Sequence, residues 1–218
     1  MRQGDNMIQI DDAGSGSLVG GTCIAAIRVE TGEFYNEVIP VDLFNKENFK
    51  SKSYIYYATD IIIRAFQVME VSHEEPINIC QGYIFEDSRN YLKKNNYNFT
   101  KGKIEDPLQT IIENNFEEYT VSLGLPREFI SYTKYPFHLH RILKWVYADY
   151  DKRVPLCKTG WKSWSKYSEL PVQTYYDKVM RSNYTCLKCG QRIENDSSVK
   201  VIRFIIDKPN YVYLHKHC

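Results

Sequence analysis

Two adjacent carboxylates stand at the end of an apolar segment near the start of the chain. In the stretch IQIDDAGSGSLVGGTCIAAI, Ile8 and Ile10 alternate with a polar residue as in a half-buried strand, and Asp11 and Asp12 come directly after them. Aspartate is rare inside strands, so this pair indicates either an Asx-type turn between hairpin strands or a site. Carboxylate oxygens are the ligands that Mg²⁺ and Mn²⁺ prefer. Glycines beside them would let a nucleic-acid backbone approach closely.

Four residues near the end of the chain have the spacing of a metal site. CLKCG supplies Cys186 and Cys189, and LHKHC supplies His215 and Cys218. Three thiolates and one imidazole suit tetrahedral Zn²⁺, with His217 as a competing ligand. Four protein ligands would close the coordination shell, so we expect a structural zinc site. The alternative is two reduced cysteine pairs without a metal.

The segments between these groups alternate in a way that predicts the fold. The expected strands are residues 7–12, 21–30, 33–44 and 77–85, and the expected helices are residues 53–71, 106–124 and 137–150. An antiparallel meander followed by a β-α-β crossover predicts a mixed sheet with helices on its faces. The last segment, SSVKVIRFIIDKPNYVYLHKH, is expected to form a hairpin that brings the two metal-binding pairs together.

Composition limits the class of protein. The chain has 218 residues, 43% of them hydrophobic, and a net charge of +1, so nucleic-acid binding would need a local basic patch. No apolar run is long enough to span a membrane, and the N-terminus lacks the apolar region of a signal peptide. We therefore expect a cytoplasmic protein without disulfides.

Composition changes after residue 150. We predict a core over residues 1–150, a basic and aromatic extension over 151–181, and a zinc module over 182–218. Lysines alternate with Trp161 and Trp164 in the extension, and Lys158 and Lys162 are candidate phosphate contacts. The alternative is a solvated edge whose tryptophans pack inward.

The first acidic stretch resembles the first motif of type 2 ribonucleases H. In that family an Asp-Glu pair precedes Ala-Gly-Arg-Gly, then a leucine, a glycine and an apolar strand. Asp11 and Asp12 match the acidic pair, and the glycine segment is matched by Gly14, Ser15 and Gly16. The resemblance continues more weakly to about residue 165, and in KYPFHLHRILKWV it matches Tyr135 with the substrate tyrosine of the family.

The resemblance implies an α/β fold with an RNase H-like mixed sheet flanked by helices. It also implies Mg²⁺ or Mn²⁺ at the acidic pair and an RNA–DNA hybrid or related structured nucleic acid as substrate. The segment from Gly14 through Ser15 to Gly16 would contact the nucleic-acid backbone, and Tyr135 would pack on a sugar.

Two positions depart from the family pattern. In the family, two of the four metal-binding carboxylates are aspartates that fall on Gln81 and Lys103 here, and glutamine and lysine are poor cation ligands. Glu105 is our first candidate to replace them as a catalytic carboxylate, with Glu86 and Asp87 as further candidates. The leading hypothesis is a metal-dependent nucleic-acid phosphodiesterase. The alternatives are a nucleic-acid-binding or adaptor protein that has lost hydrolysis, or a core that serves protein contacts through the zinc module.

Overall fold

The computed structural model describes residues 7–131, 133–180 and 184–218, and the chain forms two compact units. The first unit contains the chain up to Ser15 and then Gly21–Phe116, and the second contains Gly16–Gly20 and Glu117–Cys218. This division differs from the predicted boundary at 150, because helix α6 (Leu139–Ala148) shares one core with the C-terminal strands. The predicted boundary at 181 lies outside the described residues.

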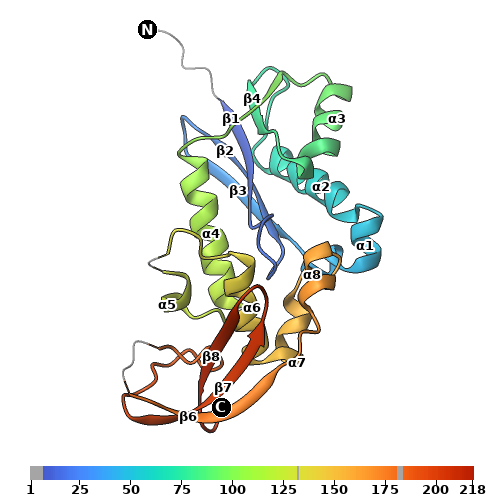
Figure 1. The fold of residues 1–218 in the computed structure, drawn as a ribbon. Helices are drawn as coiled ribbons and strands as arrows, with labels where there is room; N and C mark the ends of the chain where they lie inside the picture. Colours follow the sequence, from blue (N-terminus) through green and yellow to red (C-terminus); the bar gives the residue numbers. More distant parts are fainter. Residues whose placement is uncertain (1–6, 132, 181–183) are drawn as a thin grey trace. The chain divides into compact units, whose positions relative to one another are not determined.

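The first unit is built on a five-stranded sheet in the order β3-β2-β1-β4-β5 (Figure 1). Its strands are β1 (Ile8–Ala13), β2 (Thr22–Arg28), β3 (Glu33–Ile39), β4 (Ile77–Cys80) and β5 (Phe99–Gly102). Strand β2 is antiparallel to β1 and to β3, whereas β4 is parallel to both β1 and β5. This order, with the second strand alone reversed, is that of an RNase H-like sheet, as the sequence predicted.

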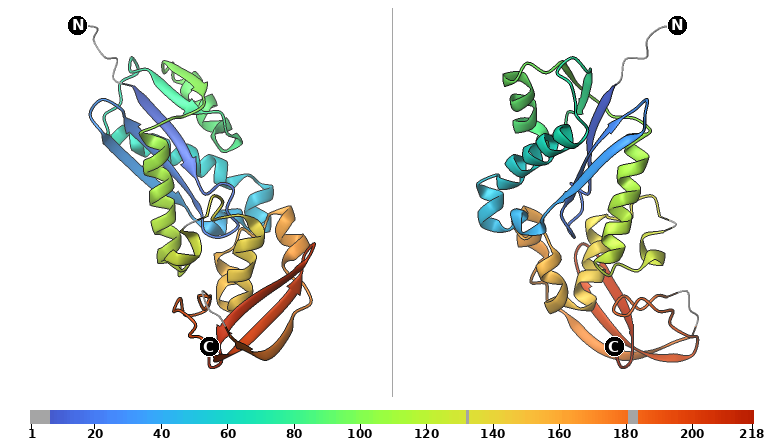
Figure 2. Two further views of the ribbon diagram at one scale, coloured as in Figure 1. Left: turned by 60° about the vertical axis from the view of Figure 1, so that its left-hand side comes forward. Right: turned by 180° about the vertical axis from the view of Figure 1, so that it is seen from behind.

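Helices cover both faces of this sheet. On one face, α2 (Ser53–Val68) packs against β2, β3 and α3 (Glu86–Lys94), and Ile8 and Ile10 of β1 belong to that core. The part of α4 (Leu108–Ser122) that belongs to this unit lies over the opposite face (Figure 2). Three shorter helices complete the unit: η1 (Val41–Phe44), α1 (Lys46–Lys50) and η2 (Tyr83–Phe85).

Gly14 makes close packing of α4 possible just after β1. Its φ of +85° is unfavourable for other residues, and a Cβ there would lie 2.1 Å from the Phe116 ring. At the start of the helix, the Asp106 carboxylate accepts hydrogen bonds from the backbone N–H and the hydroxyl of Thr110. Asp106 therefore caps α4, as expected from its place before Pro107.

The second unit combines short helices with a three-stranded antiparallel sheet in the order β6-β7-β8. Its further elements are α5 (Arg127–Ile130), α7 (Tyr150–Arg153), η3 (Val154–Leu156), α8 (Lys162–Tyr167), β6 (Gln173–Val179), β7 (Ser197–Ile205) and β8 (Pro209–His215). Trp145 of α6 and Phe204 of β7 are buried in its core. The predicted terminal hairpin is confirmed by β7 and β8.

The loop Gly16–Gly20 supplies part of this second core. Leu18 and Val19 are buried with α6, and Val19 forms an isolated bridge with Cys157. The Leu18 carbonyl accepts a hydrogen bond of 2.8 Å from the backbone N–H of Lys158, and Gly20 donates one of 2.9 Å to the Leu156 carbonyl. None of the described helices has the length and apolar character needed to cross a membrane.

Candidate metal centres

The two adjacent aspartates lie at the end of the central strand of the first sheet. Asp11 and Asp12 are both half-buried, and their carboxylates form a group with the Cys80 thiol of β4. One ligand atom from each of these three residues lies within 4.8 Å of the others. The predicted acidic pair therefore lies beside a third group that could bind a metal.

Cys80, and not Gln81, is the residue of β4 that lies beside Asp11. The register of the parallel pair sets Ile10 against Ile79, so the next residues along the two strands are Asp11 and Cys80. The resemblance to type 2 ribonucleases H puts a metal-binding aspartate at Gln81, one residue later, and the side chain of Gln81 is exposed in the structure. A shift of one residue reverses the face to which a strand side chain points, which explains the difference.

Hydrogen bonds hold the Cys80 thiol next to the carboxylate. Burial raises the pKa of Cys80 to about 12, even though the backbone N–H of Gly82 donates a 3.4 Å hydrogen bond to its sulfur. The thiol is therefore protonated at neutral pH and donates to Asp11. Arg89 holds the following turn by donating hydrogen bonds to the carbonyl oxygens of Cys80 and Gly82, at 2.9 and 3.0 Å.

Asp11 lies in an environment that disfavours its negative charge. Burial raises its pKa, hydrogen bonds from the Cys80 thiol and from the backbone N–H of Asp12 oppose this effect, and repulsion from Glu113 adds to it. A carboxylate that is partly desolvated and close to another acid favours a bound cation, because the cation offsets both costs.

Glu113 of α4 is a further acid near this group that the sequence analysis did not single out, although its carboxylate is not among the ligand atoms that lie within 4.8 Å of one another. Its carboxylate is exposed on the helix and close enough to repel the charge of Asp11. Ile10 belongs to the core on the face of the sheet that α2 covers. Asp11 is the next residue along β1, so its side chain points to the opposite face, which α4 covers. The helical pattern of the sequence indicates the position of this residue. Ile112 and Phe116 are buried positions of the helix, and Glu113, between them in the sequence, is on the exposed side.

The three acids predicted as substitutes are not part of this group. Glu105 is exposed in the connection before α4, and in the described residues it forms no cluster with Asp11 and Asp12 that could hold a metal. Lys103 is also exposed.

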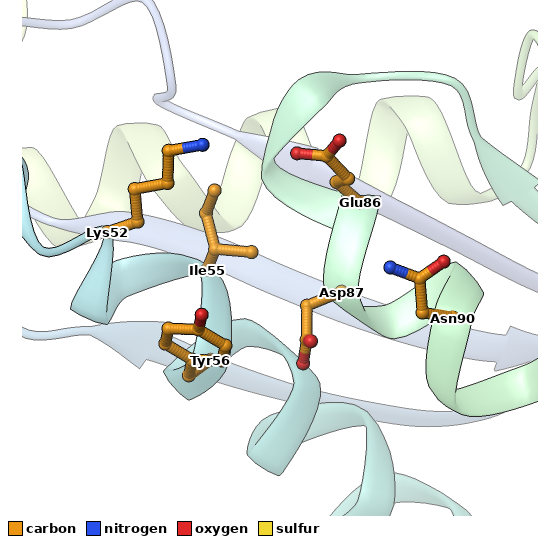
Figure 3. A pocket seen from close by; sticks show the side chains of 6 residues that line it. All are labelled: Lys52, Ile55, Tyr56, Glu86, Asp87 and Asn90. Atoms are coloured by element: carbon orange, nitrogen blue, oxygen red, sulfur yellow. The ribbon is translucent and has the colours of Figure 1, made fainter. Parts of the chain in front are cut away.

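Glu86 and Asp87 belong to another place on the first unit. They line a small pocket of about 120 Å³ between α2 and α3, where Lys52 extends toward Glu86 (Figure 3). Lys52 also lies over the ring of Tyr83, 5.1 Å from its centroid. The opposite charge of Lys52 thus offsets that of Glu86, which makes Glu86 a poor substitute ligand.

The predicted substrate contacts differ in accessibility. Ser15 and Gly16 are exposed, and Tyr135 has 63% of its surface exposed beside Lys134. Lys162 is exposed at the start of α8. These residues stay predictions, since accessibility permits substrate contact without testing it.

Lys158 corrects the predicted phosphate patch. Its side chain is fully buried, and its ammonium lies 5.1 Å from the centroid of the Trp161 ring. The loop Gly16–Gly20 runs beside the backbone at this position, since the Leu18 carbonyl accepts a hydrogen bond from the Lys158 backbone N–H. A buried ammonium cannot contact a phosphate backbone. Trp164 also packs inward, as the alternative reading expected.

The predicted zinc ligands form one compact group. The ligand atoms of Cys186, Cys189, His215 and Cys218 all lie within 4.8 Å of one another. His215 Nδ1 lies 3.2 Å from the sulfur of Cys189 and 3.8 Å from that of Cys218. This Cys₃His cluster could form a zinc module.

The surroundings of the cluster fit a zinc ion. Burial raises the pKa of Cys186, but backbone N–H groups, foremost that of Cys189, outweigh burial and lower it to about 7, which favours a thiolate. His215 Nε2 lies 3.1 Å from the carbonyl oxygen of Arg192. A hydrogen bond from Nε2 to that carbonyl leaves Nδ1 as the metal-binding nitrogen, as in many zinc sites.

No protein-family model matches the sequence, and no curated protein is similar to it. Among solved structures, the catalytic core domain of BIV integrase is similar with a TM-score of 0.33 and 14% identity, over 55% of this chain and 74% of that one. The strand order described above defines the fold, and the closer resemblance to type 2 ribonucleases H stays a prediction.

Proposed function

We propose that the chain is a divalent-metal-dependent phosphodiesterase that acts on nucleic acid. The observation that carries the proposal is the position of Asp11 and Asp12 at the end of the central strand, with Glu113 close enough to raise the pKa of Asp11. Two adjacent carboxylates on the central strand of a rigid core, with a third acid on α4 near enough to affect Asp11, offer hard oxygen ligands of the kind that Mg²⁺ and Mn²⁺ prefer.

The residues around the pair would divide the work. Asp11, Asp12 and Glu113 would hold the cation, which supplies an activated water and charge stabilisation at the phosphate. Gly14, Ser15 and Gly16 would lie along the nucleic-acid backbone. The resemblance to type 2 ribonucleases H leads us to propose RNA–DNA hybrid or related structured nucleic acid as substrate. Because Ser15 replaces the arginine of that family, we expect weaker discrimination between ribose and deoxyribose.

A second candidate function is supported by Cys80. A protonated thiol stands where a metal-binding carboxylate is expected, so the site has fewer hard ligands than hydrolysis with two ions would use. This favours a protein that binds nucleic acid on the same core without cleaving it. We infer in addition that the C-terminal cluster binds structural zinc. No observation on the described residues supports the predicted protein partner of that module.

One experiment separates the two functions. Calorimetric titration with Mn²⁺ is paired with cleavage assays on hybrid, duplex and single-stranded substrates, for the wild type and for Asp11→Asn. A phosphodiesterase binds Mn²⁺ and cleaves at least one substrate, and the variant loses both properties. Nucleic-acid binding without cleavage, unaffected by Mn²⁺, would instead show the non-catalytic function.

A further inference from the structure

The second unit contains a cavity of about 450 Å³ that none of the predicted functions uses. It is lined by residues of α5, α6 and β8 and by the segment that leads into the zinc cluster. Its volume is within the range of pockets that hold small ligands. Arg141 and Lys144 of α6 bring positive charge to its wall, and Glu128 is the acidic residue among the lining residues.

The Lys144 ammonium has no protein partner in the described part of the chain. The side chain is half-buried, and burial together with repulsion from Arg141 and Lys208 lowers its pKa. Arg141 donates a hydrogen bond to the Phe129 carbonyl, while its buried Nε has no partner among the described groups. Two cations held together without an acid between them leave an unbalanced positive charge that an anion would neutralise.

Aromatic rings stand beside these cations. Tyr184 and Tyr211 are 43% and 40% exposed, and both line the cavity. The ring of Tyr213, two residues from Tyr211 on β8, lies 4.4 Å from that of Tyr184, measured between centroids. Exposed rings of this kind offer flat faces on which bases can stack, and each stacked base adds substantially to affinity.

We propose that this cavity binds single-stranded nucleic acid, with a phosphate beside Lys144 and Arg141 and a base against Tyr184 or Tyr211. The cations alone would serve an acidic peptide equally well. The exposed rings favour nucleic acid, because a glutamate-rich peptide has no planar group to stack on them. This site lies within the second unit and does not depend on cleavage at Asp11 and Asp12.

A neighbouring cavity gives the strand room to continue. It measures about 860 Å³ and shares Glu128, Tyr184 and Thr185 with the first cavity, so the two adjoin. Its wall includes Lys188 and Arg192 of the segment that carries Cys189. A bound strand would therefore extend from Lys144 toward the zinc cluster over more than one nucleotide.

The test is fluorescence anisotropy with short labelled oligothymidylate and oligouridylate, using the full chain with zinc and without added Mg²⁺ or Mn²⁺. Lys144→Met removes the charge and keeps the length of the side chain, and Tyr211→Leu removes one ring. Lys93→Met, an exposed lysine of α3 in the first unit, is the matched control. Thermal melting of each variant reports whether it folds.

We expect Lys144→Met to weaken oligonucleotide binding about 10-fold and to reduce the salt slope by about 0.7, the value for one phosphate contact with a single strand. Tyr211→Leu should weaken binding by at least about 5-fold. Lys93→Met should change little, and Lys144→Met should melt no lower than the wild type, since it removes a half-buried charge without a partner. Equal affinity of wild type and Lys144→Met overturns the proposal. The proposal is also overturned if the protein does not bind the oligonucleotides but binds a polyglutamate peptide in a way that depends on Lys144.

Discussion

Because residue 80 is a cysteine and not an aspartate, the end of β1 has one negative charge fewer. With an aspartate at this position, three acids would lie close to Asp11, and the apo protein would bear their mutual repulsion. The thiol instead donates a hydrogen bond to Asp11 and carries no charge at neutral pH. We therefore propose Glu113 as the source of a third carboxylate for this acidic group.

Glu113→Gln should lower the affinity for Mn²⁺ at least about 10-fold, because it removes the carboxylate that we propose as an oxygen ligand. Glu105→Gln is the matched control, since both glutamates are exposed and belong to α4 or its approach. Isothermal titration calorimetry checks both variants. If Glu105→Gln abolishes binding and Glu113→Gln does not, the assignment made from the sequence holds and the one made from the structure fails.

Asp11→Asn should abolish Mn²⁺ binding while the protein stays folded. Without metal, the variant should unfold at no lower a temperature than the wild type at neutral pH, since burial and Glu113 both disfavour the charge that is removed. Circular dichroism melting and calorimetric titration give the two readings. An unchanged affinity for Mn²⁺ would show that Asp11 is not a ligand.

The sequence singled out Asp11 and Asp12 as candidates because their type and their place after an apolar strand are local features. It could not identify Cys80, because the choice between Cys80 and Gln81 depends on the register between β1 and β4, which a single strand does not reveal. Lys158 was assigned to the surface because lysine is almost never fully buried. The loop that pairs with its backbone, Gly16–Gly20, lies far away in the sequence.

At the scale of elements, Glu37 ties helix α2 to the sheet. From β3 its carboxylate accepts hydrogen bonds of 2.9 and 3.0 Å from the Arg64 guanidinium and one of 3.1 Å from the Tyr57 hydroxyl, both on α2. Burial raises the pKa of Glu37, but these bonds, together with one from Tyr35, outweigh it and hold the pKa below its ordinary value of 4.5. The charged form is thus favoured in the folded state.

Glu37→Gln should cost about 1 kcal/mol of unfolding free energy at neutral pH, a moderate value because the pair is partly exposed. Since folding lowers the pKa, this stabilisation is present above pH 4.5 and is lost as the pH falls below it. Urea unfolding of both proteins across this range should show their difference shrinking toward acid pH. Glu74→Gln, an exposed glutamate, is the control, and a difference that grows below pH 4.5 would contradict the assignment.

The helical repeats were predicted well, whereas two expected strands are shorter in the structure, because residues 33–44 form β3 and then η1, and residues 77–85 form β4 and then η2. The apolar repeat of residues 53–71 gave α2, and Gly124, with φ +99°, ends the segment of α4 as expected. Strand β5 has four residues, two of them charged or polar and exposed, and most of β6 is exposed. Such edge strands are held by main-chain pairing with their neighbours, which leaves no alternating pattern in the sequence.

At the scale of the whole molecule, two separate cores predict two separate responses to metal removal. Cys186, Leu187 and Ile193 of the zinc segment belong to the core of the second unit, and the core of the first unit contains none of them. Because ligand binding stabilises the fold that contains the site, zinc should stabilise the second unit.

Chelation of zinc, or Cys189→Ser, should therefore lower one thermal transition in differential scanning calorimetry and leave the other unchanged. Elemental analysis should find one zinc ion for each wild-type chain. Cys23→Ala, in a buried position of β2, is the control and should affect the other transition without loss of zinc. Retention of zinc by Cys189→Ser, with an unchanged melting profile, would contradict the metal site.

The loop that carries Leu18 and Val19 has a consequence for how the chain is made. A ribosome synthesises these residues before their partners Leu156, Cys157 and Lys158, which emerge only after all of β2 to α7. The second unit therefore cannot complete its core while the first unit folds, because Leu18 and Val19 have no partners to pack against until residues 156–158 are synthesised. A C-terminal fragment that starts at Glu117 would lack Leu18 and Val19. A complementation experiment would add residues 16–20 to this fragment as a free peptide.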